Sequence, residues 1–273
     1  MSVSIADLQA RARVVRQHII NSTTEAGSGH PTSSLSAVEL AVALYFEVMR
    51  HDPKNPTWPG RDRFILSKGH AAPLLYAVLA ESGYFPVSML SSLRKLGSPL
   101  EGHPNMKRLP GVEASTGSLG QGLSLGLGHA LAARIDRLDF RVFVLMGDGE
   151  INEGQVWEAA MSASRYRVEN LIAIIDQNGY QQTGPTREVL DLTPLAPRWE
   201  AFGWAVQEIN GNDLTEVVPA LKKACDTEGR PSVIVARTVK GWPIHHLLAK
   251  DPNHHGKPLT PDEARAALAA IGS

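Results

Sequence analysis

Two apolar runs that end in polar residues constrain the fold of this 273-residue chain more than any other feature. Val142–Met146 leads into Gly147-Asp148-Gly149, and Leu171–Asp176 leads to Asn178, thirty positions after Asp148. Continuous apolar runs of this length are typical of strands that are buried on both faces of a parallel sheet. Open α/β sheets bind ligands at the carboxyl ends of their strands, so the sequence predicts a ligand site that contains Asp148 and Asn178.

The two polar side chains offer hard oxygen atoms, which suit Mg²⁺ or Ca²⁺. Mg²⁺ typically completes its shell with water and substrate phosphates, so Asp148, Asn178 and a backbone carbonyl would leave room for a diphosphate. The glycines beside Asp148 would let the backbone come close to such a ligand. The alternative interpretation is a pair of tight turns, because Asp-Gly and Asn-Gly both favour turns.

Alternating helical and strand patterns along the chain predict an α/β fold: a doubly wound, mostly parallel sheet with helices on both faces. The predicted strands are Arg63–Leu66, Arg141–Met146, Leu171–Asp176, Trp204–Ile209 and Ser232–Thr238. The predicted helices are Ile5–Thr24, Ser36–Met49, Ala72–Ser82, Gly120–Arg137, Gly154–Tyr166, Leu195–Phe202, Leu214–Thr227 and Pro261–Ile271. Three stretches rich in Pro, Gly and His are predicted loops: His51–Gly60, Leu96–Gly117 and Gly241–Lys257. Long irregular segments in a compact domain are often functional.

Composition limits the kinds of molecule and of site that are expected for this protein. The net charge of −1 gives no reason to expect nucleic acid or an anionic membrane as a partner. The single cysteine, Cys225, excludes an intrachain disulfide and a cysteine-cluster zinc site. No segment has the pattern of a signal peptide or of a membrane span, so a cytoplasmic location is the default expectation.

Five motifs in order give this sequence a specific resemblance to a known family. They are Ser28-Gly29-His30-Pro31, Arg61–His70 (RDRFILSKGH), Gly102-His103-Pro104, Thr116–Gly122 (TGSLGQG) and Gly147-Asp148-Gly149-Glu150. From about Leu8 to about His255, the chain resembles the N-terminal half of a transketolase. The resemblance implies a thiamine diphosphate-binding fold in which residues 1–273 form a single diphosphate- and magnesium-binding domain of the PP type. It also implies that the pyrimidine-binding and C-terminal domains are absent from this chain.

The resemblance assigns roles around the diphosphate end of thiamine diphosphate. It implies that Asp148, Asn178 and the carbonyl oxygen of Tyr180 hold Mg²⁺ or Ca²⁺. The cofactor contacts that it implies are His70, Gly117, Leu119, Gly149, Asn178 and His255.

It also implies that four histidines are catalytic: His30, His70, His103 and His255. Ketol transfer must take a proton from a sugar hydroxyl and give one to a carbonyl, and imidazole can do both near neutral pH. At the last of these positions the sequence leaves open whether His254 or His255 reaches the cofactor. Glu150 and Glu153 are each either helix-starting acids, favoured there by the helix dipole, or members of a network that joins two active sites.

The same resemblance predicts a split enzyme. The glutamate that activates the cofactor in this family lies in the pyrimidine-binding domain, so the chain is expected to work only with a C-terminal-type partner subunit. The corresponding expectation is an α₂β₂ assembly acting on sugar phosphates. The segment Lys240-Gly241-Trp242-Pro243 departs from the loop that is common among split forms, so the sequence does not predict which sugar is used.

Three other functions compete with this interpretation. A subunit like 1-deoxyxylulose-5-phosphate synthase, or an α-type subunit of a 2-oxo acid dehydrogenase, would share the metal motif. His30, His70 and His103, each in a transketolase-like motif, argue against the dehydrogenase. A binding module without catalytic activity would hold the cofactor alone, whereas a split enzyme needs its partner.

Overall fold

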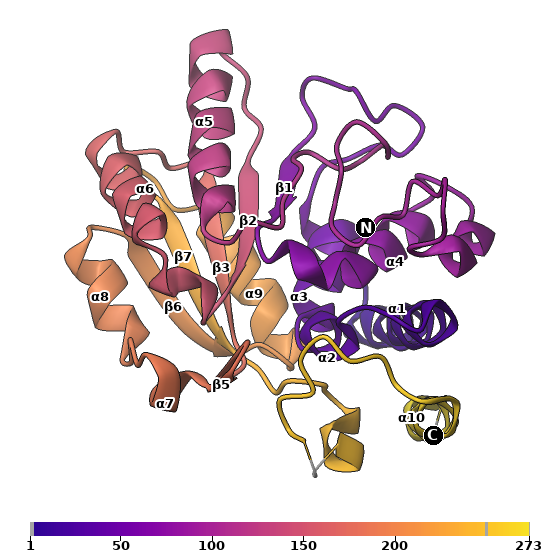
Figure 1. The fold of residues 1–273 in the computed structure, drawn as a ribbon. Helices are drawn as coiled ribbons and strands as arrows, with labels where there is room; N and C mark the ends of the chain where they lie inside the picture. The colour runs from indigo at the N-terminus through magenta and orange to yellow at the C-terminus, as the bar shows by residue number, and fades with distance from the viewer. Residues whose placement is uncertain (1–2, 249–250, 273) are drawn as a thin grey trace.

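The computed structural model describes residues 3–248 and 251–272 and centres on a parallel sheet of five strands (Figure 1). In spatial order the strands are β1 (Arg63–Leu66), β2 (Val142–Gly147), β3 (Leu171–Gln177), β7 (Ser232–Arg237) and β6 (Ala205–Asn210). All neighbouring pairs are parallel. Their carboxyl ends therefore meet at one edge of the sheet, which is where the predicted metal motif lies.

Helices cover both faces of the sheet, as the sequence predicts (Figure 1). Alternate side chains of each strand point to opposite faces, so the sheet contributes to two hydrophobic cores. On β2, Phe143 and Leu145 join the core on one face of the sheet, whereas Val144 and Met146 join the core on the other. The first core lies beneath α1 (Ile5–Ala26), α3 (Val38–Ala43), α4 (Ala72–Glu81) and α9 (Leu214–Cys225), and the second beneath α5 (Gln121–Asp136), α6 (Gly154–Arg165) and α8 (Leu195–Ala201). The helix α10 packs on α1 rather than on the sheet.

The first helix begins and ends at residues suited to those positions. Ser4 caps the first helix by accepting a hydrogen bond from the amide of Asp7, and Gly27 ends it in the left-handed conformation. The α-helices are α1 (Ile5–Ala26), α2 (Pro31–Leu35), α3 (Val38–Ala43), α4 (Ala72–Glu81), α5 (Gln121–Asp136), α6 (Gly154–Arg165), α7 (Thr186–Val189), α8 (Leu195–Ala201), α9 (Leu214–Cys225) and α10 (Pro261–Gly272). None of these helices within residues 3–248 and 251–272 is long and apolar enough to cross a membrane.

The structure confirms the five predicted strands to within one residue at each end. Seven of the predicted helices are confirmed, but the prediction of one continuous helix over Ser36–Met49 is wrong. Ala37 leaves the helical conformation, so α2 ends at Leu35, and α3 is followed by a π-helical turn over Leu44–Val48. Pro31 starts α2 earlier than predicted, because its fixed φ suits the first helical position.

Other differences are confined to short elements. A two-stranded antiparallel ribbon of β4 (Tyr180–Gln181) and β5 (Gly184–Pro185) follows Asn178. The predicted loop Gly241–Lys257 contains a 3₁₀ turn over Ile244–Leu248, and its residues 249 and 250 lie outside the described residues. A further 3₁₀ turn covers Val87–Ser92. Such short elements carry too little periodicity to be recognised in a sequence.

A buried carboxylate at the end of β3 ties the carboxyl edge of the sheet together. Asp176 is fully buried and forms an ion pair with the ammonium of Lys68, which follows β1. Burial alone would raise the pKa of Asp176, but the charge of Lys68 and several hydrogen bonds hold it below its usual value. The other side chains that donate to Asp176 are Ser36 (2.6 Å), Asn178 (3.0 Å) and Thr238. One side chain thus connects α2, β1, β3 and β7.

We predict that Lys68→Met destabilises the protein by about 3–5 kcal/mol, because it leaves the buried Asp176 carboxylate without a cation. Urea unfolding followed by circular dichroism measures this loss. Lys95→Met is the matched control, since Lys95 forms an exposed pair with Glu25 and should contribute far less. The double variant Lys68→Met/Asp176→Leu should lose less than the sum of the two single variants. Equal losses in Lys68→Met and Lys95→Met would contradict the role of the buried pair.

Candidate functional site

A cavity of about 490 Å³ lies over the carboxyl edge of the sheet. Loops that follow β1, β2, β3 and β7 form its floor, and the start of α2 and the loop before α5 form its wall. All the residues that the sequence analysis assigns to catalysis, cofactor or metal line it: His30, His70, His103, Gly117, Leu119, Asp148, Gly149, Asn178, Tyr180 and His255. Segments more than two hundred positions apart in the sequence thus meet in one pocket.

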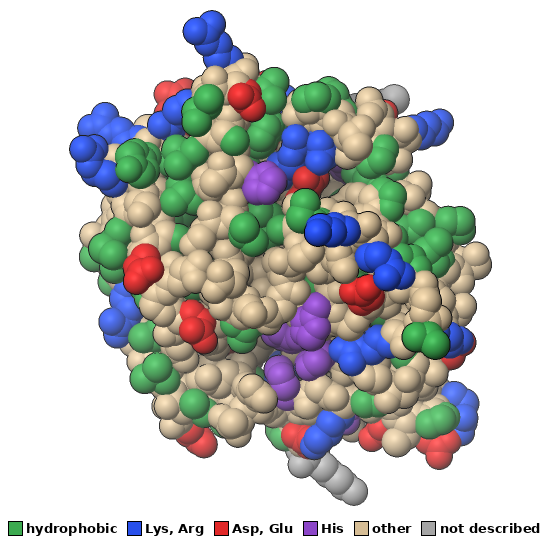
Figure 2. Space-filling view, turned by 45° about the horizontal axis from the view of Figure 1, so that its top comes forward, with side chains coloured by type: hydrophobic (Ala, Val, Ile, Leu, Met, Phe, Trp, Pro, Cys, Tyr) green, Lys and Arg blue, Asp and Glu red, His purple; other side chains and the backbone are tan. Residues whose placement is uncertain are grey.

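Three of the four predicted histidines form a cluster. The ring centroids of His30 and His70 are 5.1 Å apart, as are those of His30 and His255, and those of His70 and His255 are 5.5 Å apart. Histidine side chains also gather at one place on the face of the molecule shown in Figure 2. Of the two alternatives that the sequence left open, His255 is the one that lines the pocket, whereas the carbonyl oxygen of His254 accepts a hydrogen bond from the Thr32 hydroxyl.

Burial keeps these histidines neutral. It lowers the pKa of His30 and of His255 to about 4, and the charges of neighbouring groups add to the effect. The more deeply buried His70 has its pKa lowered to about 2, first by burial and then by Lys68. A neutral imidazole can donate from one ring nitrogen and accept at the other, which suits contact with hydroxyl and carbonyl groups.

The fourth histidine, His103, lies apart from this cluster on the loop before α5. Its pKa is also lowered, by burial and by the charge of Arg94. An added Cβ at Gly117, whose φ is +153°, would lie 3.0 Å from the His103 ring. Only glycine therefore lets the loop approach the ring so closely. Leu119, on the same loop, is 37% exposed and presents an apolar contact to the pocket.

Asp148 and Asn178 meet at the ends of β2 and β3, as their positions in the sequence predict. Asp148 Oδ2 accepts a hydrogen bond from the amide of Gly179 at 2.7 Å, which joins the two loops. The side-chain nitrogen of Asn178 donates to Asp176 at 3.0 Å, and its side-chain oxygen accepts from the backbone amide of Tyr180 at 3.1 Å. The oxygen is therefore the atom of this side chain that could contact a cation. Of the two tight turns that the sequence also allowed, the one at Asp148-Gly149 forms, whereas the backbone only bends at Gly179. Both changes of direction position these oxygen atoms.

The electrostatics of Asp148 indicate that it lacks a counter-ion. Burial raises its pKa to about 7, and the neighbouring Asp176 adds to the rise. Within the part of the chain that the structure describes, Asp148 has no ion-pair partner, and no group of three or more His, Cys, Asp or Glu is arranged to hold a metal ion. A cation at Asp148 would therefore depend on amide and carbonyl oxygens and on the oxygens of a bound ligand.

Two lysines that the sequence motifs did not assign to the site also line the pocket. Lys68 is neutralised by Asp176. Lys240 instead donates to two neutral acceptors, Asn253 Oδ1 at 2.6 Å and His255 Nδ1 at 3.3 Å. Burial and the charge of Lys68 lower the pKa of Lys240 to about 8. Both lysines follow the carboxyl end of a strand, the same signal that identified Asp148, so the sequence could have revealed them.

Glu150 connects three of the loops that surround the pocket. Its carboxylate accepts hydrogen bonds from the Ser67 hydroxyl, from the amide of Gly120 at 2.9 Å and from the amide of Gly147 at 3.0 Å. It is 3% exposed, and burial raises its pKa. Glu150 is therefore more than an acid at a helix start. Glu153, by contrast, is exposed and lies against Gly120, and its role stays open.

Several polar atoms in the pocket wall have no partner, as expected where a ligand belongs. Within the described residues, these buried atoms are His30 Nδ1, Asn152 Oδ1 and Gln181 Nε2. An added Cβ at Gly149 would lie 2.5 Å from the side chain of Gln181. Only glycine can therefore bring its backbone amide to this place. Unsatisfied buried polar groups are costly, and a polar ligand with several acceptors would satisfy them.

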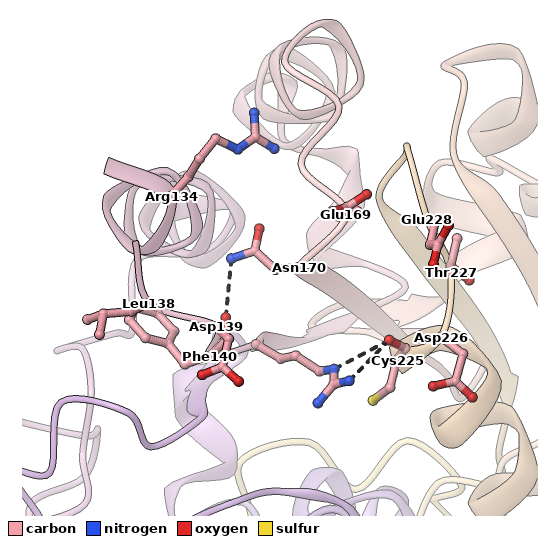
Figure 3. Close-up of a pocket in the computed structure, with 11 residues that line it drawn as sticks. Arg134, Leu138, Asp139, Phe140, Glu169, Asn170, Cys225, Asp226, Thr227 and Glu228 are labelled. Atoms are coloured by element: carbon pink, nitrogen blue, oxygen red, sulfur yellow. Dashed lines mark hydrogen bonds between the residues drawn. The ribbon is translucent and has the colours of Figure 1, made fainter. Parts of the chain in front are cut away.

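A second hollow, also of about 490 Å³, lies at the opposite, amino edge of the sheet (Figure 3). Its groups largely satisfy one another: Arg141 donates to the carbonyl of Cys225, and Asn170 donates to the carbonyl of Phe140 at 3.2 Å. It contains none of the residues that the sequence predicts for the site. The carboxyl edge is therefore the better candidate for chemistry.

Known proteins match this chain over nearly its whole length. The family described as "Transketolase, thiamine diphosphate binding domain" matches residues 8–273. A Clostridium sp. (strain MSTE9) protein, named as the subunit of a 6-deoxy-6-sulfo-D-fructose transketolase, is 44% identical over 99% of this chain and 98% of that protein. A Phocaeicola vulgatus protein, named as one subunit of an apulose-4-phosphate transketolase, is 39% identical over 94% of this chain and 91% of that protein. The structure of transketolase from Campylobacter jejuni superposes with a TM-score of 0.92 at 33% identity, over 99% of this chain and 43% of that one.

We predict that His30→Gln makes the folded chain less sensitive to acid. Between the usual histidine pKa of 6.5 and the folded value of about 4, the unfolded chain binds a proton at His30 that the folded chain does not. Above this window neither state binds the proton, so the neutral ring costs no stability. As the pH falls through the window, proton binding by the unfolded chain lowers the free energy of unfolding. The fall in Tm from about pH 7 to about pH 5 should therefore be smaller in His30→Gln than in the wild type.

The control is His246→Gln, on the exposed side of the 3₁₀ turn, which should lose as much Tm as the wild type. The raised pKa values of Asp148 and Glu150 act in the opposite direction, but they are common to all three proteins and cancel in the comparison. An unchanged acid loss in His30→Gln would show that this ring is not held neutral.

Proposed function

Because this chain belongs to the transketolase family of thiamine diphosphate-binding domains, we propose that it supplies one half of a ketol-transferring active site and that a second chain supplies the other half. The observation that carries this proposal is the pocket, where four neutral histidines lie beside the strand ends that bear Asp148 and Asn178. In the family, the cofactor is thiamine diphosphate. The substrates that we propose are sugar phosphates or related anionic sugars.

The division into two chains is supported by the relatives. The two subunits named above match this chain over nearly their whole length, whereas the chain spans less than half of the Campylobacter transketolase. The chain is thus the N-terminal subunit of a split transketolase. We propose that residues 1–273 act as a single diphosphate-binding domain and that two copies of each chain form an α₂β₂ assembly. The relatives do not favour a 2-oxo acid dehydrogenase or a deoxyxylulose phosphate synthase.

The residues in the pocket fit a diphosphate with a divalent cation. The proposed cation ligands are Asp148, the oxygen of Asn178 and the carbonyl oxygen of Tyr180. A cation would explain why a buried carboxylate without an ion-pair partner is retained at this place. The proposed contacts of the cofactor itself are Gly149 through its amide, His70, His255, Asn178, Gly117 and Leu119. Lys240, a buried cation that lines the same pocket, would add positive charge for the phosphates.

The histidines would act on the sugar. When bound, the cofactor supplies the carbon centre that carries the two-carbon unit between sugars. His30, His103 and His255 would orient the sugar hydroxyls and accept or donate their protons, for which a neutral ring is the competent form. His70, the most deeply buried of the four, would hold the others in place through its contacts with His30 and His255. The low pKa values keep the rings neutral across the physiological range.

We predict that Asp148→Asn weakens binding of thiamine diphosphate with Mg²⁺ by about 100-fold or more, because it removes a charged ligand of a hard cation. Calorimetric titration of the two-chain complex measures this affinity. Both carboxylate oxygens accept backbone hydrogen bonds, from Gly149 and Gly179, and asparagine can keep only one of them, so circular dichroism must first show that the variant is folded. Asp139→Asn, an exposed carboxylate at the amino edge of the sheet, is the control. Wild-type affinity in Asp148→Asn would refute the cation site.

A second prediction concerns the partner. The purified chain should show no ketol transfer even when saturated with thiamine diphosphate and Mg²⁺, and a C-terminal-type subunit should restore turnover. Light scattering should then report the mass of two copies of each chain. Turnover by this chain alone, if abolished by Asp148→Asn, would overturn the division of the active site between two chains.

A further inference from the structure

Asn253 joins two segments that line the pocket, although it is not itself one of the lining residues. Its side-chain nitrogen donates to the carbonyl of Gln181 at 3.1 Å and to that of Gln182 at 3.4 Å. Its side-chain oxygen accepts a hydrogen bond from the Lys240 ammonium at 2.6 Å. One side-chain amide therefore connects the ribbon that follows β3 with the segment that follows β7.

The ribbon that Asn253 contacts carries a proposed cation ligand. Gln181 immediately follows Tyr180, whose carbonyl oxygen is proposed to bind the cation, and the Gln181 side chain lies beside Gly149. Each strand of this ribbon has only two residues, and an antiparallel pair so short is marginally stable without further contacts. The hydrogen bonds from Asn253 supply such contacts, so they help to fix the position of the Tyr180 carbonyl.

The contact between Asn253 and Lys240 is neutral, although a carboxylate lies close by in the sequence. Lys240 is 4% exposed, and it forms no ion pair with any of residues 3–248 and 251–272. Asp251, the one acid between positions 251 and 257, pairs instead with Lys257. The Lys240 ammonium also lies 5.7 Å from the centroid of the Tyr180 ring, next to the same ribbon. A neutral acceptor thus holds this ammonium without cancelling its charge.

We propose that Asn253 is a positioning residue that joins the ribbon to Lys240 and leaves the charge of Lys240 available to the anionic end of a bound ligand. This inference deepens the proposed function and rests on it, because it takes a diphosphate to bind beside Lys240. An aspartate at position 253 would have nearly the same shape. It would, however, neutralise Lys240, and it could not donate to the carbonyls of the ribbon.

The alternative role for Asn253 is that of a fastener, whose hydrogen bonds only stabilise the loop that contains His255. Asn253→Leu and Asn253→Asp both remove the donation to Gln181, but only the aspartate places a negative charge beside Lys240. A fastener predicts the same loss of ligand affinity in both variants. A contact that preserves the charge of Lys240 predicts a larger loss in the aspartate variant. The charge of the introduced side chain therefore separates the two roles.

The experiment is a calorimetric titration of the complete two-chain enzyme with inorganic diphosphate and Mg²⁺, after circular dichroism has shown that each variant is folded. Asn253→Asp should lower the affinity for diphosphate by about 10–100-fold, because it cancels a charge beside the ligand. Asn253→Leu should lower it by about 2–10-fold, the value of the lost hydrogen bonds. Asn55→Asp makes the same change of charge in the exposed loop before β1 and should bind diphosphate as the wild type does.

The dependence of affinity on salt is the second readout, because salt screens the attraction between charges. Affinity should fall less steeply with added salt in Asn253→Asp and in Lys240→Met than in the wild type, since each change removes one positive charge from the pocket. Asn253→Leu keeps that charge and should follow the wild type. Lys240→Met leaves Asn253 in place, so it tests the charge of Lys240 even if the aspartate variant does not fold.

Equal affinities of Asn253→Asp and Asn253→Leu for diphosphate would identify a fastener and overturn the proposal, as would a wild-type salt dependence in Lys240→Met. Ketol transfer is assayed separately. If the enzyme transfers no ketol unit but the diphosphate affinities follow the expected order, the role of Asn253 is supported and the proposed function is refuted. Ketol transfer together with equal affinities in the two variants would have the opposite meaning. A wild-type enzyme that does not bind diphosphate would refute both.

Discussion

The buried ion pair between Lys68 and Asp176 is the interaction on which the rest of the site depends. Two charges of opposite sign at the ends of β1 and β3 are removed from water, and each is stabilised by the other and by hydrogen bonds. Since Ser36 and Thr238 also donate to Asp176, the pair fixes where α2, β1, β3 and β7 lie relative to one another. The pocket is formed by the loops that leave these elements.

The pocket combines neutral and charged groups in separate places. The histidines are neutral because burial makes their protonated forms unfavourable, and this holds where a sugar would bind. Asp148 and Lys240 are instead buried groups with incomplete charge compensation, at the strand ends where a diphosphate and a cation would bind. Burying either charge without full compensation is unfavourable, and a bound group of opposite charge would remove this cost. The charges that line the pocket therefore carry information about what it binds.

Glu150 and Gly117 show how the loops of the pocket are held without regular secondary structure. Glu150 fixes three backbone segments through one carboxylate, and Gly117 permits contact with His103 that a side chain would block. Rigid loops of this kind allow residues from distant parts of the chain to keep the spacing that catalysis requires.

The sequence by itself determined the strands, the class of fold and the positions of Asp148 and Asn178, because apolar periodicity and strand-end motifs are local properties. Its motifs also identified the four histidines. Only the tertiary structure decided that His255 rather than His254 lines the pocket, that the helix predicted over Ser36–Met49 is interrupted, and that Lys240 lines the same pocket as Asp148. These outcomes depend on contacts between segments far apart in the chain. No local pattern encodes them, since each is set by the packing of one element on another.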